Sequence, residues 1–267
     1  MKLHSLGYRT DLIFTRFDGE TIDRGSYLVV KTHSNPNYFW GNLLVFDRAP
    51  KAGDFKKWKE IFKTEFTNPR IYHFTFAWDS PSGETGEISQ FLNEEFHLEK
   101  SVVLTAESVH LPTKYHPEIQ VEPIRQDQDW EKSIQIQIAG ANDSLSKSQW
   151  EKFYRSQMDR YRKMVELERG VWFGAYLNLN LVACLGIFTE SGLGRYQTVS
   201  THPDYQRQGI CGSLVYKSAQ YAFEKMGVQT LVMVADVDYH AARIYESVGF
   251  RPSEKMVGVC WWDKTRA

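Results

Sequence analysis

Strands alternate with helices along the second half of this 267-residue sequence. The run Leu231–Ala235 is apolar without interruption, as is usual for a strand that is covered on both faces. The alternation is typical of the α/β class, in which helices pack on the faces of a sheet. We therefore predict an α/β fold with a mixed α+β sheet for this half. The expected elements, in order, are strands at 121–124, 171–177, 181–189, 195–201, 230–235 and 255–261, and helices at 127–138, 146–168, 212–226 and 239–248.

The first half contains shorter elements and many aromatic residues. We expect strands at 26–32, 39–46, 70–78 and 102–106 and helices from Asp54 and Ile88. Residues 108–120 contain two prolines and no clean periodicity, which indicates a linker. We therefore divide the chain into domains at 1–118 and 119–267. The aromatic fraction is 14%, which predicts that aromatic side chains form much of the first domain's core.

Charge and cysteine usage narrow the class of protein. The 32 basic and 33 acidic side chains give a net charge of −1, which argues against binding to a nucleic-acid backbone. Cys184, Cys211 and Cys260 are far apart, so neither a disulfide framework nor a metal site is indicated. The N-terminus lacks a signal-peptide pattern, and no apolar run is long enough to span a membrane. We expect a cytoplasmic protein with no metal, membrane or nucleic-acid partner.

The stretch from Val199 to Leu214 combines a strand end, a polar turn and the start of a helix. The free N–H groups and the dipole at a helix N-terminus favour an anion, and Arg207 adds positive charge. Gly209 and Gly212 allow the backbone to approach a ligand closely. The spacing is neither that of a P-loop nor that of a Rossmann turn. By itself, therefore, the stretch fits either a phosphate site or an ordinary turn.

Two motifs resemble those of the GNAT acetyltransferase superfamily. Gln206, Gly209 and Cys211 fill the pattern Q/R-x-x-G-x-G/A, and 201–203 (Thr-His-Pro) stand where V-x-P is usual. Residues 238–250 are similar to the second signature, N-x-x-A-x-x-L/I/F-Y-x-x-x-G-F. The departures are Cys211 for Gly or Ala, Thr201 for Val, and Asp238 for Asn. The motif order and the element order together imply a GNAT fold for residues 119–267.

The resemblance implies an acetyl-CoA-dependent N-acetyltransferase in which a primary amine attacks the thioester directly. Acetyl-CoA would be the co-substrate, with its pyrophosphate on the amides of 207–212 and its pantetheine arm beside the strand that ends at Thr201. A backbone N–H near Val199 would polarise the thioester carbonyl, and Tyr245 would protonate the departing thiolate. The implied cofactor-binding residues are Val199, Thr201, Gln206, Arg207, Gln208, Gly209, Ile210, Cys211, Gly212, Asp238, Ala241 and Tyr245.

The proton acceptor for the amine stays open at this point. Glu190, at the end of a strand, is the first candidate, and His202, Asp236 and His240 are the others. Tyr245 also fits a packing role, and Asp238 also fits a helix N-cap. An acyl-enzyme intermediate on Cys211 is not favoured.

The first half resembles the family only in element order. Residues 70–107 repeat the order strand, polar loop, helix, strand of residues 195–235, which indicates a degenerate GNAT-like domain. Its loop 79–87 carries three carboxylates and lacks the glycine pattern, so we expect no CoA site there. In the aromatic turn 35–42, Tyr38, Trp40 and Asn42 either line an acceptor site or simply form and pack a turn.

Two other functions fit the same motifs. One is a non-catalytic acyl-CoA-binding or regulatory module, and the other is a transferase of a longer acyl group. The acceptor, a small molecule or a peptide, is not determined by the sequence, and neither is the choice between monomer and homodimer.

Overall fold

The computed structural model describes residues 1–141, 146–237 and 241–266, and of Ala241 it describes the backbone alone. The chain forms two compact units. Unit 1 comprises 1–103, 234–238 and 253–267, and unit 2 comprises 104–233 and 239–252. The expected linker at 108–120 thus lies inside unit 2, whereas the domain boundary at residue 118 stays a prediction.

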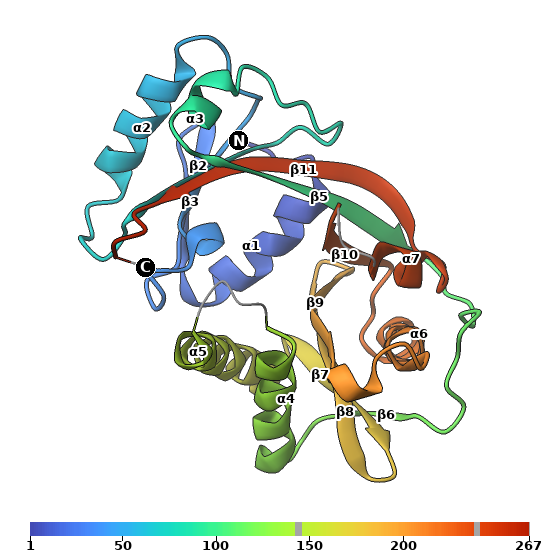
Figure 1. The fold of residues 1–267 in the computed structure, drawn as a ribbon. Coiled ribbons are helices and arrows are strands. Elements are labelled where there is room, and N and C mark those ends of the chain that lie inside the picture. Colours follow the sequence, from blue (N-terminus) through green and yellow to red (C-terminus); the bar gives the residue numbers. More distant parts are fainter. Residues whose placement is uncertain (142–145, 238–240, 267) are drawn as a thin grey trace. The chain divides into compact units, whose positions relative to one another are not determined.

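Unit 1 is a sheet with helices on both of its faces (Figure 1). Strands β1, β2 and β3 pair antiparallel, β3 and β4 pair parallel, and β11 pairs antiparallel with β4. Strands β5, β10 and β11 have residues in both units. The elements that lie wholly or partly in unit 1 are α1 (Leu6–Asp18), β1 (Glu20–Asp23), β2 (Tyr27–Lys31), the 3₁₀ turn η1 (Phe39–Gly41), β3 (Leu43–Phe46), α2 (Asp54–Glu65), β4 (His73–Trp78), α3 (Ser89–Asn93), β5 (His97–Ala106), β10 (Thr230–Asp236) and β11 (Arg251–Trp262).

An aromatic cluster forms the core between this sheet and helices α2 and α3. Trp58 of α2 is buried and stacks on Phe46 of β3, with ring centroids 3.7 Å apart. Phe76 and Phe91 pack into the same cluster. Large rings bury much apolar area and pack edge to face, so a few of them can fill the space under a short helix. The expected aromatic core of the first half is therefore present.

Helix α1 and the turn η1 differ from the elements expected in this half. No helix was expected at the N-terminus, yet Ser5 caps α1 through a hydrogen bond from the Tyr8 N–H to its hydroxyl. The strand expected at 39–46 begins only at Leu43, because residues 39–41 form η1. The Asn42 side chain holds the chain ahead of this turn, because it accepts from the Thr32 N–H and donates to the Tyr38 carbonyl.

The strands of unit 2 follow the order β10-β9-β8-β7-β6. Strands β6 to β9 pair antiparallel, and β9 pairs parallel with β10. Helices α4 and α5 cover one face and α6 covers the other (Figure 1). Residues 181–188 are consequently all buried. The elements that lie wholly in unit 2 are β6 (Gln120–Pro123), α4 (Asp127–Ala139), α5 (Lys147–Glu166), β7 (Gly170–Leu177), β8 (Asn180–Glu190), β9 (Leu193–Thr201), the 3₁₀ turn η2 (Pro203–Tyr205), α6 (Ile210–Lys225) and α7 (Ala241–Glu246).

Local sequence signals explain the ends of these elements. Ser146 and Gln149 form a capping box at the start of α5. Asn178 and Leu179 have φ values of 49° and 65° in the hairpin between β7 and β8.

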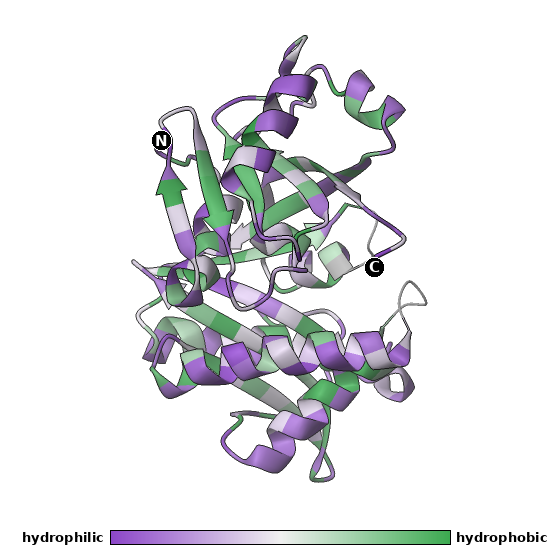
Figure 2. Ribbon diagram, turned by 90° about the vertical axis from the view of Figure 1, so that its left-hand side faces the viewer, coloured by the Kyte–Doolittle hydropathy of each residue, from purple (hydrophilic) through white to green (hydrophobic). Residues whose placement is uncertain are grey.

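The helices alternate between hydrophilic and hydrophobic residues, whereas the strands are mainly hydrophobic (Figure 2). No helix in the described part of the chain has the length and apolar character needed to cross a membrane.

Candidate functional site

Strand β9 carries a bulge shortly before it ends. Cys184 of β8 faces Ser200 and Gly186 faces Gln197, so Thr198 and Val199 together oppose one residue of β8. Thr198 has a φ of 50°, which is strained for a β-branched side chain. A bulge disrupts the hydrogen-bond ladder and redirects backbone groups, so this is the place where a backbone N–H of β9 can turn toward a ligand. Val199, whose backbone N–H is predicted to polarise the thioester carbonyl, is one of the two bulge residues.

The turn after β9 is held by its own side chains. His202 caps η2, and its Nδ1 accepts from the Asp204 N–H at 3.4 Å. The Gln206 amide donates to the Thr201 carbonyl at 3.4 Å, and the Gln208 amide donates to the Asp204 carbonyl at 3.2 Å. Both glutamines of the motif therefore brace the turn that leads into α6.

The backbone N–H groups at the start of α6 are available to a ligand. Among the described residues, no N–H of residues 207–212 has a hydrogen-bond acceptor, and the first bond at this end runs from the Ser213 N–H to the Gly209 carbonyl. Six consecutive donors thus lie at the positive end of a 16-residue helix. An anionic group such as a phosphate is the ligand that this arrangement favours.

Two glycines leave room at this turn. Gly209 has a φ of 85°, and a Cβ there would lie 2.9 Å from the Lys114 carbonyl oxygen. A Cβ on Gly212 would lie 3.4 Å from the same oxygen. The chain around Lys114 therefore lies against both glycines. Lys114 is outside both motifs and was not identified from the sequence.

The side chains of Ile210 and Cys211 do not supply reactive groups. Ile210 is 1% exposed and anchors the start of α6 in the core. Burial raises the pKa of the Cys211 thiol to about 12, and a contact with Thr201 lowers it only in part. A thiol with such a raised pKa is a poor nucleophile at neutral pH, and the absence of an acyl intermediate on Cys211 stays a prediction.

The second motif, residues 238–250, includes all of α7. Asp238 and His240 lie outside the described residues, and Ala241 is the first residue of α7. Tyr245 is 5% exposed, and its ring meets that of Phe250 edge-on, with centroids 6.4 Å apart. This burial fits both roles expected for Tyr245, so its part in proton transfer stays a prediction.

Glu190 lies far along the sheet from the bulge. It is paired with Leu193, the first residue of β9, whereas Val199 lies near the other end of that strand. Six residues of extended strand span roughly 20 Å. The structure therefore does not bring Glu190 and Val199 together, and a base at Glu190 would have to act through intervening groups or water.

A pair of carboxylates in unit 1 was not identified as a pair from the sequence. Glu99 lies on β5 and Asp236 at the end of β10. Burial, followed by the charge of Asp236, raises the pKa of Glu99. A carboxyl group whose pKa is raised by burial and by a second carboxylate is a feature of many functional sites. The pair was missed because this strand was expected to begin only at residue 102, which left Glu99 outside it.

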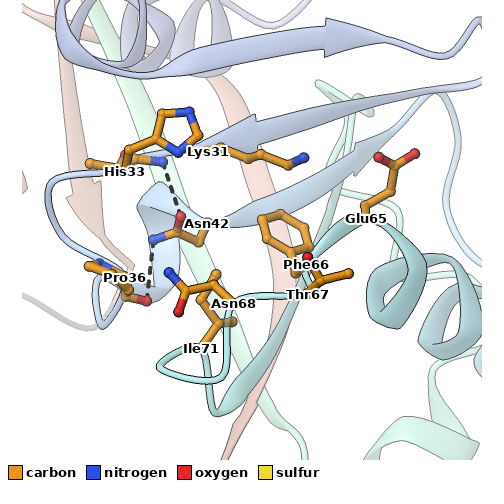
Figure 3. Close-up of a pocket in the computed structure, with 10 residues that line it drawn as sticks. Lys31, His33, Pro36, Asn42, Glu65, Phe66, Thr67, Asn68 and Ile71 are labelled. Carbon is orange, nitrogen blue, oxygen red and sulfur yellow. Dashed lines mark hydrogen bonds between the residues drawn. The ribbon is translucent and has the colours of Figure 1, made fainter.

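The acidic loop and the aromatic turn of unit 1 have structural roles. The Asp79 carboxylate accepts hydrogen bonds from the backbone N–H groups of His4 and Ser5 at 2.7 and 2.9 Å. The Asn42 side chain accepts from the Thr32 N–H and lies beside a cavity of about 190 Å³ (Figure 3). Figure 3 also shows its amide directed at the Pro36 carbonyl. Asn42 thus holds the turn, as one of the two interpretations of this segment required.

Comparisons with known proteins agree with the motifs. Residues 141–250 match the family model described as "Acetyltransferase (GNAT) family". A comparison with curated protein sequences gives no significant match.

Several solved structures share the fold across nearly the whole chain. A functionally unknown conserved protein from Staphylococcus epidermidis ATCC 12228 matches with a TM-score of 0.75 and 14% identity, covering 92% of this chain and 95% of that chain. A GCN5-related N-acetyltransferase from Kribbella flavida matches with a TM-score of 0.66 and 14% identity, covering 96% and 93%. A tandem GNAT protein from the clavulanic acid biosynthesis pathway matches with a TM-score of 0.52 and 12% identity, covering 82% and 75%.

The turn, the motif order and these matches together define the class. Residues 141–250 match the GNAT acetyltransferase family, and the N-terminal half is GNAT-like in its fold. The predicted fold class and the predicted family resemblance are both confirmed.

Proposed function

We propose that the protein is an acetyl-CoA-dependent N-acetyltransferase that acts on a primary amine of a small molecule or a peptide. The observation that carries the proposal is the row of unbonded N–H groups at residues 207–212, within the region that matches the GNAT family. These donors and the helix dipole suit the pyrophosphate of acetyl-CoA. The balanced net charge of −1 suits such an acceptor better than a polybasic one.

The bulge and the turn would each bind a different part of acetyl-CoA. Residues 207–212 would hold the pyrophosphate, with Gln206 and Gln208 keeping the turn in shape and Arg207 adding charge. The end of β9, from Val199 to Thr201, would pair with the amide groups of the pantetheine arm as an added strand does. Asp238 and Ala241, from the second motif, stay proposed contacts of acetyl-CoA.

The reaction needs one bond to form and one to break. The neutral amine nitrogen attacks the thioester carbon, the C–N bond forms, and the C–S bond breaks as the thiolate leaves. The backbone N–H at Val199 stabilises the charge on the carbonyl oxygen. Tyr245 gives a proton to the thiolate, and a base removes a proton from the amine. Glu190 stays our proposed base, but at roughly 20 Å from the bulge it would need a chain of ordered waters rather than a single one.

An amine panel with acetyl-CoA tests this function. The panel contains a polyamine, an amino acid, an aminoglycoside and an N-terminal peptide, and release of the free CoA thiol is followed for each. We expect at least one amine to raise thiol release above the rate of hydrolysis and to gain an acetyl group by mass. Binding of acetyl-CoA with no turnover on any amine indicates the non-catalytic module instead. Faster turnover with a longer acyl-CoA indicates the longer-chain transferase.

A further inference from the structure

The segment 108–119, which we call the strap, is held by hydrogen bonds to other parts of unit 2, mainly to helix α6. At its start, the His110 N–H donates to the Val248 carbonyl at 2.9 Å. In its middle, the His116 N–H donates to Ser213 Oγ at 2.8 Å. At its end, the Lys217 ammonium donates to the Ile119 carbonyl at 2.5 Å. The strap is therefore part of the folded unit and runs along α6 from its N-terminal end.

The strap brings Lys114 to the turn that precedes α6. The Lys114 ammonium donates a hydrogen bond to the carbonyl of Arg207. A Cβ on Gly209 would lie 2.9 Å from the Lys114 carbonyl oxygen and 3.2 Å from its Cγ. Backbone, side-chain stem and ammonium of Lys114 thus all lie against the segment whose N–H groups have no acceptor.

The Lys114 ammonium is not paired with a carboxylate of any described residue. Among the described residues, no carboxylate lies within 4 Å of its ammonium, and its partner at Arg207 is a neutral carbonyl. Asp204, the one acid of the turn, is exposed and lies 3.7 Å from the His202 ring. A charge-assisted bond to a phosphate oxygen is stronger than a bond to a neutral carbonyl. An incoming phosphate can therefore take over the ammonium.

We propose that Lys114 is a phosphate-binding residue that the strap adds to the motif turn, so that the acetyl-CoA site contains a cation from outside both family motifs. The inference rests on the proposed function, because acetyl-CoA supplies the phosphate. On binding, the ammonium passes from the Arg207 carbonyl to a phosphate oxygen. Both the pyrophosphate and the 3′-phosphate of the ligand offer this chemistry, and a comparison of two ligands distinguishes them.

Calorimetric titration of the full chain with acetyl-CoA and with its 3′-dephospho form provides the test. Lys114→Ala should weaken acetyl-CoA binding about tenfold, which equals about 1.4 kcal/mol. Lys114→Arg should retain most of the affinity, and the salt dependence of binding should be smaller in Lys114→Ala than in the wild type. A loss seen with both ligands assigns the contact to the pyrophosphate, and a loss seen only with acetyl-CoA assigns it to the 3′-phosphate.

Lys217→Ala is the matched control, because it removes another ammonium–carbonyl contact between α6 and the strap without removing charge from the turn. It should leave the affinity unchanged. Equal affinity in Lys114→Ala and the wild type overturns the inference, as does an equal loss in Lys217→Ala. A wild-type protein that binds neither ligand overturns the proposed function itself, and this result is distinct because it precedes any comparison of variants.

Discussion

The Asp79 carboxylate accepts a hydrogen bond from the Ser5 N–H at 2.9 Å, although the two residues are 74 positions apart. Glu254 accepts from the Leu6 N–H at 2.9 Å in the same unit. Two acidic side chains thus accept hydrogen bonds from the chain at, and just before, the start of α1. At the start of α6 the N–H groups of residues 207–212 have no acceptor among the described residues. The acceptors for this second helix end must come from a ligand or from solvent.

Replacing Asp79 should weaken the fold without affecting acetyl-CoA. Asp79→Asn turns one acceptor into a donor that faces the N–H groups of His4 and Ser5, so the free energy of unfolding should fall by about 2 kcal/mol. Urea unfolding measures the change. The control is Asp159→Asn, an exposed residue paired with Lys163 at 2.7 Å, which should change the free energy by less than about 0.5 kcal/mol. Equal effects of the two variants contradict the capping role.

Gly209→Ala should impair both the fold and the binding of acetyl-CoA. The φ of 85° at this position strains an alanine by about 1 kcal/mol, and its Cβ would also press on the Lys114 carbonyl. We expect acetyl-CoA affinity, measured by calorimetry, to fall about tenfold as one N–H donor is displaced. Gly227→Ala is the control, because Gly227 has a φ of 65° with no atom within 4 Å. It should lose stability alone, and a matching loss of affinity would contradict the assignment.

Tyr245→Phe should lower turnover about a hundredfold, because the phenol that protonates the thiolate is lost. The affinity for acetyl-CoA should change little, since the ring and its packing against Phe250 remain. Steady-state kinetics and calorimetry separate the two effects. Tyr221→Phe removes a hydroxyl from a tyrosine on α6 that packs against Phe173, and it should leave both quantities unchanged. A fall in affinity equal to the fall in turnover shows that Tyr245 serves packing only.

His73 should make unit 1 sensitive to acid. Its Nε2 donates to the Asn42 carbonyl at 3.0 Å, and burial lowers its pKa to about 4. The unfolded histidine titrates near pH 6.5, so between about pH 4 and pH 6.5 the unfolded chain binds a proton that the folded chain does not. Stability is therefore complete above about pH 6.5 and falls by about 3 kcal/mol as the pH drops to 4.

Urea unfolding of His73→Gln across this pH range measures the His73 contribution. The variant should lose this part of the pH dependence, whereas His33→Gln, whose ring is exposed, should keep it. A wild-type pH profile that His73→Gln reproduces would falsify the assignment.

The sequence predicted those parts of the fold that depend on neighbouring residues. The helix expected from residue 212 begins two residues earlier, at Ile210, directly after Gly209, and the helix expected from Ser146 is α5, which Ser146 caps. The hairpin at Asn178 follows from the tolerance of asparagine for a positive φ. Each signal lies within a few residues of the feature that it determines.

Features that depend on distant residues were not predicted. Helix α1 is fixed by Asp79 and Glu254, which lie far away in the sequence. Lys114 reaches the turn through a contact with Arg207, 93 positions later. The distance between Glu190 and the bulge follows from the register of β8 on β9, which the expected strand boundaries left undetermined.

Hydrogen exchange with and without acetyl-CoA tests whether the N–H groups before α6 bind a phosphate of acetyl-CoA. Saturating acetyl-CoA should slow exchange of the backbone N–H groups of residues 207–212, because these donors then bond a phosphate. Exchange should not change in the loop 79–87, where Asp79 is already bonded to the chain before α1. Calorimetric binding of acetyl-CoA that leaves exchange at 207–212 unchanged, or that protects 79–87 instead, would show that acetyl-CoA does not bind at this turn.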